Sequence, residues 1–128
     1  MSQARRARGA AARRAGRRAE VLAALWLMAK GYRILGFRLQ TPQGEIDLLV
    51  ARGRVLAAVE VKIRPTLDAA LEAVGPVQRQ RLRRALAAIA ARRARSREIV
   101  LRLDLMALAP GRLPRHIPGA WREDGDDP

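Results

Sequence analysis

Acidic side chains and a lysine lie close together in the middle of the chain. They belong to two short segments, Gly-Glu-Ile-Asp at 44–47 and Val-Glu-Val-Lys at 59–62. Each segment lies in a run rich in Val, Ile and Leu, which is typical of a β-strand. Carboxylates that share a surface with a lysine could hold a divalent cation and stabilise charge on a phosphate group.

The pairing of these two strands decides whether the acids meet. A two-residue loop with glycine first, Gly53-Arg54, would join the strands as a tight hairpin. Counting back from that loop places Asp47 opposite Glu60, and Glu45 opposite Lys62, on one face of the hairpin. The sequence therefore predicts two carboxylates side by side, with a lysine next to them.

The apolar residues of the hairpin favour the same register. Strand alternation predicts that Ile46, Leu48 and Val50 share the other face. A three-residue loop would place Glu60 opposite Ile46 and bury a carboxylate among apolar side chains. A shift of one residue moves every side chain to the wrong face, so the two-residue loop is expected.

Two carboxylates directly opposite each other destabilise a hairpin unless something separates their charges. A divalent cation between Asp47 and Glu60 would do so, and oxygen ligands with open water positions suit Mg²⁺ or Mn²⁺. The alternative is a surface hairpin with a Glu45–Lys62 ion pair and two solvated carboxylates.

The amino-acid composition also favours a functional site at these residues. Residues 1–64 contain only four acids, namely Glu20, Glu45, Asp47 and Glu60. Lys62 is one of two lysines in a chain with 24 arginines, although a general surface cation here would be expected to be arginine. A lysine acts as a compact point charge that can titrate, which a guanidinium cannot.

The charge of the whole chain predicts a polyanionic partner. Its formal net charge is +14, and the sequence pI is about 11.9. Coding bias explains arginine over lysine but not the excess of bases over acids. Nucleic acid, and DNA in particular, is the expected partner through its phosphates; a membrane surface or an RNA scaffold is the alternative.

Other features exclude some classes of site and set the expected location. There are no cysteines, which excludes disulfides, thiolate zinc sites and a cysteine nucleophile. The apolar run at 21–29 follows an arginine-rich stretch, but nine residues are too few to span a bilayer. We expect a cytoplasmic protein without a membrane partner.

The pattern of elements predicts one α/β domain. Residues 1–16 are expected to form a flexible basic arm, and 123–128 an acidic tail. Between them, at 17–122, we expect a mixed sheet with flanking helices in the order helix, three strands, helix, strand. The expected helices are 17–30 and 77–95, with a short helical stretch at 67–74, and the expected strands are 33–40, 45–51, 55–64 and 98–109.

The two acidic segments, with Val-Glu-Val-Lys continuing into Ile-Arg, resemble the core of the PD-(D/E)xK nucleases. More closely, residues 17–122 resemble the YraN family of bacterial proteins, which is similar to archaeal Holliday-junction resolvases. Further matching segments are Ala19-Glu20, residues 31–35 (Gly-Tyr-Arg-Ile-Leu), Arg81-Leu82, residues 102–104 (Arg-Leu-Asp) and His116-Ile117. The resemblance implies a restriction-endonuclease-like α/β fold.

The resemblance also implies roles for individual residues. Asp47 and Glu60 would be metal ligands, Glu20 would reach the metal directly or through water, and Lys62 would be catalytic. Two positions depart from the family pattern. Gln78 stands where the family often has a lysine, and Arg38 stands in a region where it often has an asparagine.

These expectations lead to two candidate functions. The first is a Mg²⁺- or Mn²⁺-dependent DNA endonuclease that acts on duplex or branched DNA. In it, Arg64, Arg79 and Arg83, together with the basic arm, would hold the phosphate backbone without reading sequence. The second is a nuclease-like module that binds nucleic acid or a repair complex without cutting. A homodimer would suit a cut in both strands, but the sequence does not indicate one.

Overall fold

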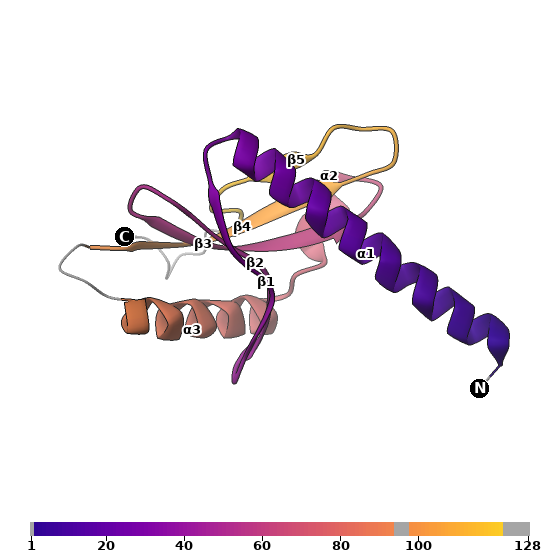
Figure 1. Cartoon of the computed structure of the whole chain (residues 1–128), viewed down its shortest axis with the longest axis horizontal. Coiled ribbons are helices and arrows are strands. Elements are labelled where there is room, and N and C mark those ends of the chain that lie inside the picture. The colour runs from indigo at the N-terminus through magenta and orange to yellow at the C-terminus, as the bar shows by residue number, and fades with distance from the viewer. Residues whose placement is uncertain (1, 94–97, 122–128) are drawn as a thin grey trace.

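A computed structural model describes residues 2–93 and 98–121, and it shows a five-stranded sheet with helices on both sides (Figure 1). The elements follow one another along the chain as α1 (Gln3–Ala29), β1 (Arg33–Thr41), β2 (Gly44–Arg52), β3 (Val55–Ile63), α2 (Leu67–Glu72), α3 (Pro76–Arg93), β4 (Val100–Leu108) and β5 (Arg115–Ile117).

The sheet is mixed, as predicted. Its strands lie in sequence order from β1 to β5, and every neighbouring pair is antiparallel except β3 and β4, which are parallel. The segment with α2 and α3 makes the crossover that a parallel pair requires. The predicted succession of helix, three strands, helix and strand is present. The short strand β5 was not predicted, because three residues carry too little pattern to be recognised.

The predicted hairpin loop is confirmed. Arg52 pairs with Val55, and Gly53 has a φ of 59°. A positive φ at the first loop residue alone is the conformation that favours glycine there. This turn sets the β2–β3 register, which continues as predicted to the pair of Leu48 with Val59.

Two apolar layers cover the two faces of the sheet, so β2 and β3 are buried on both sides. One layer lies between the sheet and α1, and the other lies between the sheet and α3. Side chains from alternate strand positions contribute to the two layers. The α1-side cluster includes Ala23, Leu27, Leu48, Val50, Val59 and Met106, and the α3-side cluster includes Ile46, Leu49, Ala58, Leu82, Leu86 and Leu103.

Helix α1 begins much earlier than the sequence predicted. The expected start was residue 17, after an irregular arm, but the helix begins at Gln3, with the Ser2 side chain accepting a hydrogen bond from the Arg5 N–H. Alanine and arginine favour helix, and this propensity acts without the apolar periodicity that the prediction required. The first buried residue of α1 is Ala19, so the first half of the helix projects from the sheet (Figure 1).

The acidic tail predicted at 123–128 lies outside the described residues. Among the described helices, none is long and apolar enough to cross a membrane.

Candidate metal-binding site

The β2–β3 ladder opens where the acidic residues lie. Beyond the pair of Leu48 with Val59, the Val61 N–H donates a hydrogen bond to Oδ2 of Asp47, at 2.9 Å. The same register would have placed residue 61 opposite residue 46, so a carboxylate takes the place of a main-chain acceptor. Asp47 and Glu60 thus occupy the first positions past the regular ladder, as neighbours on adjacent antiparallel strands.

The predicted shared face for Ile46 and Leu48 is wrong. Leu48 packs in the α1-side cluster, whereas Ile46 packs in the α3-side cluster. The alternation changes opposite Arg38, which lies in β1 between the partners of these two residues and has a φ of 44°. A left-handed residue interrupts the extended backbone on which simple alternation depends.

Glu60 is buried on the α3 side of the sheet, with only 3% of its surface exposed. Its Oε2 accepts a hydrogen bond from Nε2 of Gln78 at 3.3 Å and lies 3.9 Å from Nζ of Lys62. Burial and the nearby charge of Asp47 raise the pKa of Glu60 to about 8, although Lys62 opposes the shift. Without a further cation, this carboxyl therefore holds its proton near neutral pH.

Asp47 interacts electrostatically with Glu60 and Lys62. Burial raises the pKa of Asp47, and the hydrogen bond from Val61 and the charge of Lys62 oppose that rise. Lys62 therefore faces both carboxylates of the predicted pair. Lys62 is thus a compact cation beside one buried and one half-buried acid, and their binding of a metal ion stays a prediction.

Glu45 was predicted to lie opposite Lys62, and that placement stays a prediction. Among the described residues, Glu45 accepts a hydrogen bond from Nε2 of Gln40 at 2.6 Å. Gln40 is its direct partner in β1. The prediction considered only the β2–β3 hairpin. Glu45 lies beyond the last regular β2–β3 pair, but it still pairs with Gln40 of β1.

Glu20 reaches the region from α1 but has its own cation. Its Oε1 lies 2.6 Å from the guanidinium of Arg38. Burial raises the pKa of Glu20, Arg38 opposes the rise, and the charge of Asp47 adds to it. Arg38, noted in the sequence only as a departure from the family pattern, thus connects Glu20 to the strand beside Asp47.

The donor set fits a hard cation in part. Within residues 2–93 and 98–121, no group of three or more His, Cys, Asp or Glu side chains lies close enough to bind one ion together. Mg²⁺, however, commonly binds one or two carboxylates and keeps its waters or takes substrate phosphates. Asp47 and Glu60 supply such a pair, while ligation by Glu20 stays a prediction.

The three arginines predicted to bind nucleic acid have contacts within the chain. A guanidinium nitrogen of Arg79 donates to the main-chain carbonyl of Val74 at 2.8 Å, and one of Arg83 donates to that of Trp121 at 3.0 Å. Both arginines are half-buried, whereas Arg64 is exposed at the end of β3 and donates to the carbonyl of Ile63. Their contact with a phosphate backbone stays a prediction.

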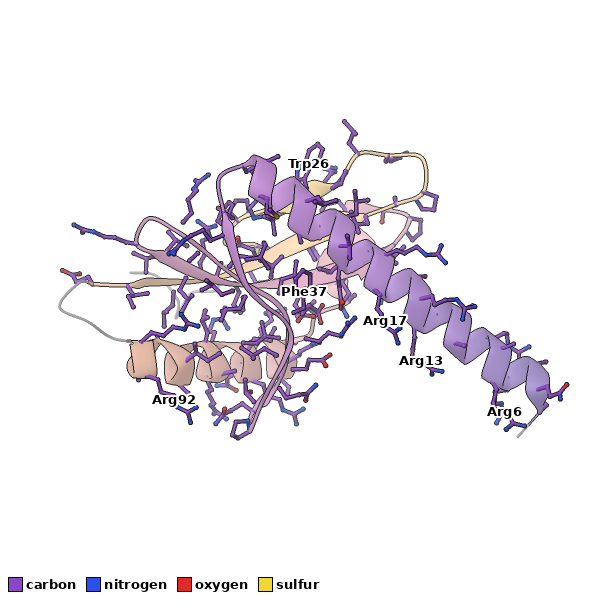
Figure 2. All side chains as sticks on the ribbon, in the orientation of Figure 1. Arg6, Arg13, Arg17, Trp26, Phe37 and Arg92 are labelled. Carbon is purple, nitrogen blue, oxygen red and sulfur yellow. The ribbon has the colours of Figure 1, made fainter. Side chains whose placement is uncertain are left out.

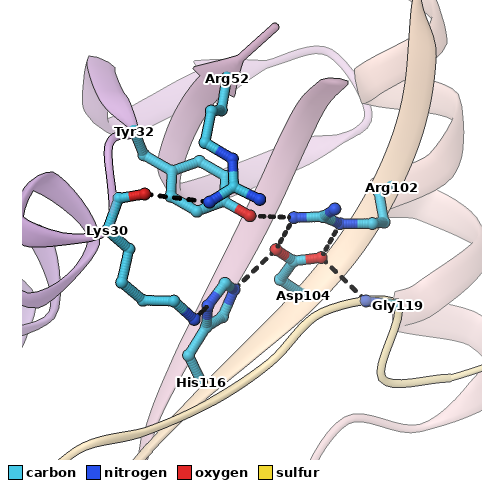
Figure 3. A network of polar contacts seen from close by, with 7 residues as sticks. All are labelled: Lys30, Tyr32, Arg52, Arg102, Asp104, His116 and Gly119. Atoms are coloured by element: carbon cyan, nitrogen blue, oxygen red, sulfur yellow. Dashed lines mark hydrogen bonds and ion pairs between the residues drawn. The ribbon is translucent and has the colours of Figure 1, made fainter. Parts of the chain in front are cut away.

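A second charged group lies on the other face of the sheet, around Asp104 of β4 (Figure 3). Asp104 is fully buried and pairs with Arg102, whose two nitrogens lie 2.7 and 2.8 Å from its oxygens. It also accepts from Nε2 of His116 at 2.8 Å and from the Gly119 N–H at 3.0 Å. Burial by itself would raise the pKa of Asp104, but these hydrogen bonds more than offset it and lower the pKa.

This network ties the end of α1 to β4 and β5 (Figure 3). Arg102 donates to the Tyr32 hydroxyl at 2.6 Å, and Nζ of Lys30 contacts Nδ1 of His116 at 2.5 Å. Arg52 lies over the Tyr32 ring, 4.6 Å from its centre, and donates to the Lys30 carbonyl. Because Asp104 pairs with Val59, whose side chain lies on the α1 side, this network lies on the opposite face of the sheet from Glu60.

Sequence comparisons agree with the resemblance. The model of the Uncharacterised protein family UPF0102 matches residues 19–108, which is more than half of the chain. A UPF0102 protein of Caulobacter vibrioides (strain NA1000 / CB15N) is 68% identical over 117 residues, covering 91% of this chain and 94% of that protein. A UPF0102 protein of Caulobacter sp. (strain K31) is 71% identical over 123 residues, covering 96% and 88%. The chain therefore belongs to the UPF0102 (YraN) family.

Proposed function

We propose that this protein is a Mg²⁺- or Mn²⁺-dependent endonuclease with a restriction-endonuclease-like core, acting on duplex or branched DNA in the cytoplasm. The observation that carries the proposal is the buried carboxyl group of Glu60 beside the half-buried Asp47, with Lys62 3.9 Å from Glu60. Burial and the neighbouring Asp47 raise the pKa of Glu60 to about 8, and carboxyl groups with strongly shifted pKa values concentrate at functional sites.

In this proposal, each residue has a separate task. Asp47 and Glu60 would hold the cation, which when bound would polarise a phosphoryl oxygen and lower the pKa of a water. Lys62 would supply a positive charge next to the phosphate, where negative charge increases during cleavage. The hydrogen bond from Val61 orients the Asp47 carboxylate toward its neighbour strand before any ion arrives.

The choice of DNA duplex over single strands rests on charge and on aromatic content. The net charge of +14 favours a phosphate backbone. Proteins that hold single strands usually stack bases on exposed aromatic rings. Of the four aromatic residues, Tyr32 is buried, Trp26 and Trp121 pack against the apolar clusters, and only Phe37 is strongly exposed.

A nuclease-like module that binds DNA without cutting is the second candidate. Two observations favour it: Glu20 is bonded to Arg38 rather than grouped with the other acids, and Glu60 accepts from a neutral Gln78 where relatives often carry a lysine. In that case the carboxylate pair would serve metal-dependent binding alone.

Cleavage of linear, flap and four-way DNA in Mg²⁺ or Mn²⁺ distinguishes the two. We expect Asp47→Asn, Glu60→Gln and Lys62→Met each to reduce cleavage by at least about 100-fold, as the loss of a key electrostatic group does. Glu72→Gln, an exposed acid on α2, is the matched control and should cleave normally. Wild-type protein that binds these DNAs but cuts none of them with either metal would refute the nuclease and support the binding module.

A further inference from the structure

The projecting half of α1 carries a one-sided row of arginines. Residues 3–18 contain seven arginines and no acid, and all seven are exposed. At 3.6 residues per turn, Arg13 and Arg17 lie about 20° to either side of Arg6 around the helix axis. We call these three residues the α1 arginine stripe, and Figure 2 shows them on the same side of the helix, the side toward Phe37.

The stripe points along the helix to the candidate site. Glu20 lies on nearly the same line, about 40° from Arg6, and about 21 Å farther along the axis. Its carboxylate bonds Arg38, the β1 residue that lies across from Asp47 between the two flanking pairs. The row of arginines therefore ends where the acidic residues begin.

The projecting half of α1 does not pack against any other element within the described chain. Its first buried residue is Ala19, and glycines at 9 and 16 weaken the helix. Arg13 and Arg17 are four residues apart, a spacing at which like charges repel on a helix. A ligand with closely spaced negative charges would relieve that repulsion.

We propose that the α1 arginine stripe binds the phosphate backbone of a nucleic acid duplex and guides it to the acidic residues. The stripe and Glu20 together span about 21 Å, which corresponds to about six base pairs of duplex. The DNA identity of the partner rests on the proposed function, but the phosphate contact does not require cleavage.

The chemistry of the helix favours a duplex over a membrane surface. Interfacial helices insert large apolar side chains between the lipids along the length that carries their charges. Residues 3–18 contain no apolar side chain larger than alanine. The exposed apolar residues of α1, Val21, Leu22, Leu25 and Met28, lie in its second half, beyond the stripe.

The test compares two triple variants with equal loss of charge. One replaces the stripe (Arg6→Gln, Arg13→Gln, Arg17→Gln). The other replaces exposed arginines about 80–160° around the helix from Arg6 (Arg8→Gln, Arg14→Gln, Arg18→Gln). Binding of the full chain to a 20-base-pair duplex is measured by fluorescence anisotropy in EDTA over a range of salt concentrations, so that cleavage cannot contribute.

We expect the stripe variant to lower the slope of log affinity against log salt by about 2.7, which is roughly 0.9 for each lost phosphate contact. The other triple variant should lower it by less than about 0.9. Arg6→Lys, Arg13→Lys, Arg17→Lys should keep the wild-type slope, because this variant retains the three positive charges of the stripe.

Equal losses in the two glutamine variants would overturn the inference, because they would indicate diffuse charge. So would a stripe-specific loss on phosphatidylserine vesicles without one on DNA. A stripe-specific loss on DNA together with no cleavage in Mn²⁺ would support the stripe while refuting the nuclease. Normal cleavage by the stripe variant with unchanged DNA affinity would support the nuclease while refuting the stripe.

Discussion

The main-chain N–H of Val61 donates a hydrogen bond to Oδ2 of Asp47 across the end of the β2–β3 ladder, at 2.9 Å. A side chain of one strand thus satisfies the backbone of the next strand at the point where their regular pairing stops. This contact holds Asp47 in place without any ion, beside a Glu60 carboxyl whose raised pKa of about 8 keeps it protonated near neutral pH.

A divalent ion should stabilise the wild-type protein. At an ion concentration about 100-fold above Kd, ligation of the folded state contributes about 2.7 kcal/mol, or several degrees in melting temperature. Asp47→Asn keeps an acceptor for the Val61 N–H but removes a charge, so it should match or exceed wild-type stability in EDTA and gain little from Mn²⁺. Thermal melts in EDTA and in Mn²⁺ measure both effects. Glu72→Gln should behave as wild type, and equal Mn²⁺ shifts in wild type and Asp47→Asn would exclude Asp47 as a ligand.

Stability in EDTA should fall as the pH rises from about 5 to 8. Folded Glu60 keeps its proton up to its pKa of about 8, whereas the unfolded chain releases it near the ordinary glutamate pKa of 4.5. Between these values the unfolded state binds fewer protons, so stability falls by up to about 1.4 kcal/mol per pH unit. Urea unfolding at several pH values measures the slope, and Glu60→Gln should flatten it. A Glu60→Gln variant with the wild-type slope would show that another group is responsible.

Removal of Asp104 should damage the fold rather than the chemistry. Asp104→Ala leaves the Arg102 guanidinium without its buried partner, and breaking a buried pair costs about 3–5 kcal/mol. The lowered pKa of Asp104 also predicts that its contribution is present above the unfolded pKa and is lost as the pH falls through the folded value. Chemical denaturation at neutral pH measures the loss. Asp68→Ala, an exposed acid on α2, should cost far less, and similar costs for both would contradict the network's structural role.

The stability cost of the left-handed backbone at Arg38 can be measured separately from the contribution of its ion pair with Glu20. Both Arg38→Gly and Arg38→Ala remove the contact with Glu20, but only alanine retains the steric cost of a φ of 44°. We therefore expect the glycine variant to be more stable than the alanine variant by about 1 kcal/mol. Denaturant midpoints of the two variants measure the difference. An alanine variant as stable as the glycine variant would mean that β1 relaxes at this position.

Local patterns in the sequence predicted the strands, the two-residue turn and the register between Leu48 and Arg52, because glycine at the loop and apolar alternation act over a few residues. They did not predict the position of Ile46, because the change of face arises at Arg38 on a different strand. The helical start at Gln3 was also missed, since residues 3–18 bury no apolar side chain that would produce a periodic pattern.

The types and spacing of Asp47, Glu60 and Lys62 were determined by the sequence alone, as was their place on one hairpin, because the tight turn at Gly53 fixes the register up to Leu48 and Val59. Tertiary structure decided their environment. Burial under α3 brings Gln78 to Glu60 and raises its pKa, and packing of α1 brings Glu20 to Arg38. Solvation and charge at a point depend on every element around it, and those elements are far apart in the chain.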